Sequence, residues 1–130
     1  MKNQKIIVDT SIWIEYFKNE AIIVDLLERK IMNSSIYMVG PIVSELLQCV
    51  RSEAEYNKLE ACIDAIPYFE VRLKDWKKAG NLSSNLRKKG ITIPLTDIII
   101  SAIAINKKAE IYTKDKHFHC IPGISLYKRE

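Results

Sequence analysis

The sequence predicts an α/β fold, a three-layer α/β/α sandwich with a mostly parallel central sheet. Short runs rich in β-branched residues alternate with longer runs whose apolar residues recur near the helical period. Dipeptides typical of tight hairpins do not separate these runs. We therefore expect helices to connect the strands, an arrangement that favours parallel pairing with helices on both faces of the sheet.

The first expected strand runs from Lys5 to Val8 and is followed by a carboxylate, Asp9. Thr10 and Ser11 are expected to cap a helix that starts at Ile12. Asp9 would then lie at the carboxyl end of a central strand, the edge where ligands bind in open α/β sheets.

The remaining elements follow in order along the chain. Helices are expected near residues 12–18, 21–32, 41–51, 52–66, 73–88 and 98–106, and further strands near 36–39, 68–72, 110–113 and 124–127. Ser52 and Glu55 resemble a capping box, Gly90 is a plausible helix stop, and residues 116–123 read as a loop. The helix at 98–106 is apolar on nearly every side, so it should be buried.

Length and composition indicate one folded domain, residues 1–130, without need of a second module. A hydrophobic content of 48% with 28% charged residues excludes a disordered or low-complexity chain. The first four residues lead directly into a strand, which leaves no room for a signal peptide, and no apolar run is long enough to span a membrane. We expect a cytoplasmic protein without membrane association.

The three cysteines, Cys49, Cys62 and Cys120, are an odd number and are too scattered for a zinc site or a secreted disulfide framework. Free cysteine is among the most frequently buried residue types. We expect three buried thiols.

Charge is distributed unevenly along the chain. Residues 1–71 carry 7 basic and 11 acidic side chains, whereas residues 72–130 carry 13 basic and 5 acidic ones. The C-terminal half is therefore the side expected to meet an anion such as a nucleic acid, although basic runs are also common on solvated helix faces.

The six aspartates divide by context. Three lie in expected helices among polar residues, at positions 25, 64 and 75, whereas Asp9 and Asp115 follow strand-like runs and Asp97 precedes the apolar helix. Carboxylates that converge on one sheet edge repel each other unless a cation lies between them. Hard divalent ions such as Mg²⁺ or Mn²⁺ take oxygen ligands of this kind.

Each acid also has a simpler interpretation. Asp97 could cap its helix, Asp9 could be a turn residue, Asp115 could be a solvated loop charge beside two lysines, and Glu45 could be a surface glutamate. Their joint placement at two strand ends and near two helix starts favours a shared site.

Four stretches carry a resemblance to a known family. IVDTSIWIEYF with Asp9, IVSELLQ with Glu45, LTDIIISAIA with Asp97 and IYTKDKHF with Asp115 resemble the four acidic motifs of PIN-domain ribonucleases. The compact size is similar to the VapC-type toxins of toxin–antitoxin pairs, and the resemblance covers essentially the whole chain. It implies a metal-dependent endoribonuclease site built from Asp9, Glu45, Asp97 and Asp115. We expect the three aspartates to hold Mg²⁺ or Mn²⁺ directly, while Glu45 acts through water, either as an outer ligand or as the base.

The same resemblance implies supporting groups and partners. Thr10 and Thr113 fall at hydroxyl positions that accompany the first and last acids, while His117 and His119 are candidates for stacking or proton transfer or are ordinary loop histidines. An RNA substrate, a cognate antitoxin and a homodimer are implied, and the first helix with Trp13 offers core packing or a partner surface.

The basic half of the chain offers a path for the RNA backbone. The candidate phosphate contacts are Arg72, Lys74, Lys77, Lys78, Arg87, Lys88, Lys89, Lys114 and Lys116.

Two other functions compete with that of a nuclease. A PIN-like domain that binds RNA or protein without cleavage would be favoured by the loss of an acid, and all four are present. A phospho-receiver domain would need paired acids after the first strand and an acceptor aspartate after the third, and this chain has neither. The sequence does not identify the RNA.

Overall fold

The computed structural model describes residues 4–129, in which five parallel strands form one sheet in the order β3-β2-β1-β4-β5. The strands are β1 (Ile6–Val8), β2 (Ile36–Val39), β3 (Tyr68–Phe69), β4 (Glu110–Tyr112) and β5 (Ser125–Leu126). β1 lies at the centre and pairs with both β2 and β4. The expected fold class is confirmed. The expectation about a leader concerns residues 1–3, which lie outside the described part.

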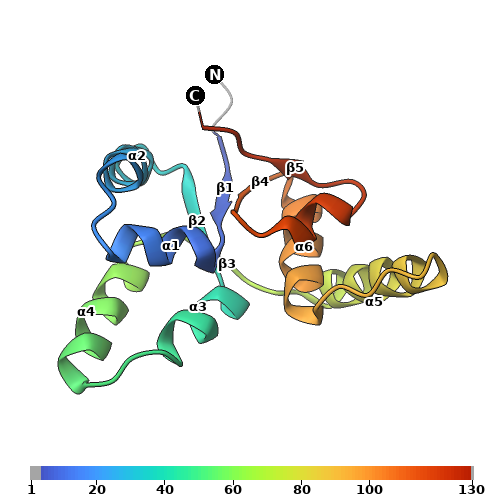
Figure 1. Ribbon diagram of the computed structural model, residues 1–130, viewed down its shortest axis with the longest axis horizontal. Coiled ribbons are helices and arrows are strands. Elements are labelled where there is room, and N and C mark those ends of the chain that lie inside the picture. Colours follow the sequence, from blue (N-terminus) through green and yellow to red (C-terminus); the bar gives the residue numbers. More distant parts are fainter. Residues whose placement is uncertain (1–3, 130) are drawn as a thin grey trace.

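Helices cover both faces of the sheet, with α1, α2 and α4 on one side in Figure 1 and α5 and α6 on the other. The helices are α1 (Thr10–Phe17), α2 (Ala21–Met32), α3 (Gly40–Leu47), α4 (Glu53–Asp64), α5 (Leu73–Lys88) and α6 (Leu95–Lys107), and a short 3₁₀ helix, η1 (Lys116–Cys120), follows β4. Within residues 4–129, none of these helices combines the length and apolarity needed to cross a membrane.

The core is built around β1 and α6. All three β1 side chains are buried, and so is every residue of α6 from Ile98 to Ala104. This burial confirms the prediction from the apolar character of that helix. Because β1 is central and parallel to β4, the residues that follow these two strands emerge next to each other at the carboxyl edge of the sheet.

The start of α1 differs from the expectation. The backbone carbonyl of Asp9 accepts hydrogen bonds from the N–H groups of Ile12 and Trp13, at 3.0 and 3.1 Å, so Asp9 is the N-cap and the helix begins at Thr10. The predicted capping by Thr10 and Ser11 is therefore wrong. Their hydroxyls instead contact carboxylates, as described below.

α3 is also shorter than expected. It ends at Leu47 rather than near residue 51, and residues 48–52 form the turn into α4. The expected capping contact is present there, since the N–H of Glu55 donates to Ser52 Oγ at 3.1 Å. The region expected as a loop at 116–123 contains η1, which is anchored by the fully buried Phe118.

The expectation of three buried thiols is wrong. Cys49 and Cys120 are exposed and Cys62 is half-buried. Cys49 lies in the turn after α3, and Cys62 lies on α4, which lies on the outside of the fold and has no fully buried residue.

Asp75 lies among polar residues in the sequence, yet its side chain is fully buried. Its Oδ2 accepts the N–H of Arg72 at 2.8 Å, and its Oδ1 accepts a hydrogen bond from Asn106 Nδ2 at 2.6 Å. The carboxylate thus holds the start of α5 against the end of α6, and these partners offset the cost of burying it.

Candidate functional site

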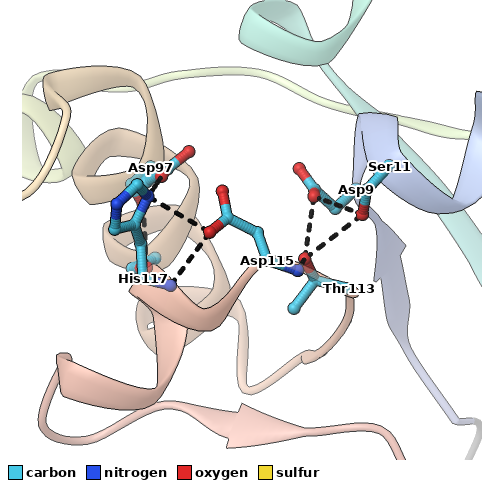
Figure 2. A network of polar contacts seen from close by, with 7 residues as sticks. Asp9, Ser11, Asp97, Thr113, Asp115 and His117 are labelled. Carbon is cyan, nitrogen blue, oxygen red and sulfur yellow. Dashed lines mark hydrogen bonds and ion pairs between the residues drawn. The ribbon is translucent and has the colours of Figure 1, made fainter.

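Four acids reach the carboxyl edge of the sheet from four elements of the chain. Asp9 follows β1, Glu45 lies on α3, Asp97 lies in the first turn of α6, and Asp115 precedes η1. Figure 2 shows three of them facing a common space, with Asp9 on the β1–α1 side and Asp97 on the α6 side. The joint placement predicted from the sequence is found, although the role of each residue stays a prediction.

Asp9 is fixed by two hydroxyls. Its Oδ2 accepts hydrogen bonds from Thr113 Oγ1 at 2.8 Å and from Ser11 Oγ at 2.9 Å. Thr113 Oγ1 also accepts the backbone N–H of Asp115 at 2.9 Å (Figure 2). One threonine therefore links the first and last acids, and the second carboxylate oxygen of Asp9 makes none of the described hydrogen bonds.

Glu45 is held from the neighbouring helix. Its Oε1 accepts a hydrogen bond from Thr10 Oγ1 at 2.8 Å, and the side chain is half-buried. The two threonines singled out from the sequence, Thr10 and Thr113, thus each orient one acid. Glu45 is not an ordinary surface glutamate, because a residue of α1 positions it.

Asp97 is the most perturbed of the four acids. The residue is 8% exposed, and its pKa is raised from 3.8 to about 6. Burial is the main cause, because it disfavours the charged form, and repulsion by the carboxylates of Asp115, Asp9 and Glu45 adds to it. His117 acts in the opposite direction. All three other acids therefore raise the pKa of Asp97, as expected for carboxylates that share one site.

Asp115 and Asp97 meet at a histidine. His117 Nδ1 lies 3.1 Å from Asp115 Oδ1 and 3.4 Å from Asp97 Oδ2. Asp115 Oδ1 also accepts the backbone N–H of His117 at 2.9 Å and so caps η1. His119 is exposed on the same turn. The structure brings the first histidine into the acidic cluster and leaves the second at the surface.

Helix capping, the simpler interpretation of some of these acids, holds only for Asp115. Neither the Asp9 nor the Asp97 side chain makes a helix-capping hydrogen bond. Asp115 does cap η1, yet its carboxylate also faces the ring shared with Asp97. Helix capping therefore does not explain why Asp9 and Asp97 are buried.

The donor set fits a hard divalent cation. One oxygen each from Asp97 and Asp115 and one nitrogen of His117 lie within 4.8 Å of one another. Two more carboxylates, from Asp9 and Glu45, act on the same space. A cation there would relieve the repulsion that raises the pKa of Asp97.

Two members of this network were missed or undervalued from the sequence. Ser11 was expected as a helix cap, whereas its hydroxyl binds Asp9 and accepts the N–H of Lys114 at 3.1 Å. His117 was left open between a loop residue and a functional one. Its position two residues after an acid that ends a strand was the available signal.

The candidate phosphate contacts lie mostly on α5, which extends away from the sheet beyond α6 in Figure 1. Lys78 is half-buried and Lys114 Nζ is 3.0 Å from Glu15 Oε1, so these two are less available than the others. Lys116, on η1, is exposed and lies in sequence between Asp115 and His117. The exposed members on α5 and at its ends are Arg72, Lys74, Lys77, Arg87, Lys88 and Lys89.

Comparison with known proteins shows the family of the chain. The family model described as "PIN domain" matches residues 6–124. The chain is 29% identical over 125 residues to "Ribonuclease VapC11" from Mycobacterium tuberculosis and to "VapC ribonuclease Mb1587" from Mycobacterium bovis, covering 92% of this chain and 93% of each relative.

Solved structures share the fold. VapBC2 from Rickettsia felis, bound to a promoter DNA fragment, aligns with a TM-score of 0.84 at 21% identity, over 98% of this chain and all of that one. VapC20 from Mycobacterium tuberculosis, described as a toxin that cleaves the sarcin–ricin loop, aligns with a TM-score of 0.65 at 13% identity, over 94% and 98% of the two chains.

Proposed function

The chain belongs to the PIN-domain family, and from this membership and the acidic site we propose that it is a metal-dependent endoribonuclease, the toxin of a toxin–antitoxin pair. The observation that carries the proposal is the convergence of four carboxylates, those of Asp9, Glu45, Asp97 and Asp115, at one edge of the sheet. Their proximity, together with burial, raises the pKa of Asp97. The relatives named as VapC ribonucleases support the RNA substrate.

We assign the metal-binding roles to the acids that face one another. Asp9, Asp97 and Asp115 would hold Mg²⁺ or Mn²⁺, with Glu45 acting through water. The cation would lower the pKa of a bound water and offset the charge on the phosphate during hydrolysis. The protein keeps the carboxylates in place, since Thr113 and Thr10 each donate a hydrogen bond to one of them.

The substrate backbone would be bound by basic groups outside the acidic cluster. Exposed lysines and arginines on α5 and the exposed Lys116 can contact phosphates, which sets affinity without reading sequence. The cytoplasm is the proposed site of action because RNA is the substrate.

The partner proposal rests on an apolar groove beside the site. Side chains of Ile14 and Phe17 from α1 and Leu59 from α4 line it, and it extends to Thr10 and Glu45. Phe17 and Ile14 are 41% and 43% exposed, so the groove presents apolar surface that a partner could bury. One structure of similar fold, from Klebsiella pneumoniae, is described as a toxin–antitoxin complex. We propose that a cognate antitoxin covers this groove and that the chain forms a homodimer.

The test is cleavage of total RNA by purified protein in Mg²⁺ or Mn²⁺. Wild-type protein should give discrete fragments that disappear in EDTA and in the Asp9→Asn variant, whereas Asp64→Asn, an exposed position on α4, should cleave normally. Absence of cleavage by folded, antitoxin-free protein would instead favour a domain that binds RNA or protein without cutting it.

A further inference from the structure

We infer that His117 is a nitrogen ligand of the metal ion held by Asp97 and Asp115, and that it makes the site prefer Mn²⁺ to Mg²⁺. The inference rests on the proposed function, because it concerns the same metal. It begins from the ring position, in which Nδ1 faces one oxygen of each of these two acids.

The separations are those of neighbouring ligands on one cation. In an octahedral complex with bonds of about 2.1 Å, adjacent ligand atoms lie roughly 3 Å apart. His117 Nδ1 lies 3.1 Å from Asp115 Oδ1 and 3.4 Å from Asp97 Oδ2. Small movements of the three side chains would let all of them bind a single ion.

The ring is also held in place by the chain around it. The backbone N–H of His117 donates to Asp115 Oδ1 at 2.9 Å, and the next residue, Phe118, is fully buried. These contacts fix the turn, so the imidazole faces the acids although its side chain is 53% exposed. His119, on the same turn, is exposed and is not among the groups that could share a metal.

A nitrogen ligand changes which cation the site selects. Mg²⁺ prefers oxygen ligands and keeps most of its water, whereas Mn²⁺ also takes carboxylate oxygens but, as a transition-metal ion, accepts an imidazole nitrogen more readily than Mg²⁺ does. Carboxylates alone would suit either ion. An added imidazole therefore shifts the preference toward Mn²⁺, with the Nδ1 lone pair directed at the ion and the proton retained on Nε2.

Pulsed electron paramagnetic resonance of Mn²⁺ bound to the wild-type protein tests the contact without RNA. We expect modulation from a directly bound ¹⁴N nucleus, which changes to the ¹⁵N pattern when histidine alone is ¹⁵N-labelled. Bound Mn²⁺ without a nitrogen coupling, or failure to bind Mn²⁺, would overturn the inference.

Variants then test selectivity by calorimetry. His117→Ala should weaken Mn²⁺ binding about tenfold or more and change Mg²⁺ binding by no more than about twofold. His117→Asn, which offers an oxygen in place of Nδ1, should lose the nitrogen coupling, and His119→Ala should behave as wild type. Equal losses for both ions, or a coupling retained in His117→Ala, would contradict a ligand role.

These results separate the inference from the nuclease proposal. A nitrogen coupling in a protein that does not cleave RNA would uphold the role of His117 and refute the nuclease. Cleavage by a protein whose bound Mn²⁺ lacks the coupling would do the opposite.

Discussion

Replacing Asp97 by Asn should stabilise the metal-free protein while abolishing RNA cleavage. The carboxylate is nearly buried and repelled by its neighbours, and its pKa is raised from 3.8 to about 6. A rise of about two pKa units corresponds to about 3 kcal/mol of unfavourable free energy in the ionised native state. The amide removes that charge, so the melting temperature should rise by roughly 10 °C in a domain of this size.

The pH dependence follows from the direction of the shift. The native state binds this proton more tightly than the unfolded chain, so the contribution of Asp97 to stability falls as pH rises from about 3.8 to about 6 and then stays low. Urea unfolding in EDTA should therefore find Asp97→Asn more stable than wild type at pH 7.5 and nearly equal to it at pH 4.

A control variant and the addition of Mn²⁺ complete the test. Asp25→Asn removes an exposed carboxylate paired with Arg29 and should change the free energy of unfolding by less than about 0.5 kcal/mol. Mn²⁺ at about 100 times its Kd should add about 2.7 kcal/mol to the wild type and little to Asp97→Asn. An Asp97→Asn variant that is less stable than wild type at pH 7.5 in EDTA, or a difference in stability that does not depend on pH, would refute the unfavourable burial of the Asp97 carboxylate.

Three further predictions concern other parts of the chain. Asp75→Ala should lower the free energy of unfolding in urea by about 2–3 kcal/mol, because the N–H of Arg72 and the amide of Asn106 lose their acceptor. The control Asp64→Ala, at an exposed position on α4, should have little effect on the same quantity. Cys49, which lines the apolar groove, should be alkylated several-fold more slowly when the antitoxin is bound, and the exposed Cys120 serves as the internal reference. Thr113→Val should reduce cleavage about tenfold or more at saturating RNA with a small change in melting temperature, because Thr113 Oγ1 donates to the carboxylate of Asp9 and accepts the backbone N–H of Asp115.

The sequence predicted the elements that carry most of the buried surface. The β-branched run before Asp9 and the uniformly apolar helix after Asp97 both became core elements, because burial of such side chains is non-directional and follows composition and period. The four acids could be placed together for the same reason, since the ends of parallel strands share one edge.

What could not be predicted depends on specific hydrogen bonds across the fold. From the sequence, Asp75 is an ordinary polar helix residue. Its burial depends on a hydrogen bond from Asn106 Nδ2, thirty-one positions later, which the sequence does not show. The sequence indicates Ser11 as a helix cap. In the structure the backbone carbonyl of Asp9 caps the helix, and the Ser11 hydroxyl donates to the Asp9 carboxylate. Cys49 and Cys120 are exposed because they lie in the turn after α3 and at the end of η1, and local sequence does not encode the burial of such positions.

The most direct test compares metal binding with RNA cleavage in one titration. Metal-free protein is supplied with increasing Mn²⁺, and bound metal and the rate of RNA cleavage are measured at each concentration. We predict that both rise with the same midpoint and that both are lost in Asp97→Asn. Cleavage that persists in EDTA, or that saturates at a concentration where no metal is bound to the acids, would contradict a metal-dependent nuclease at this site.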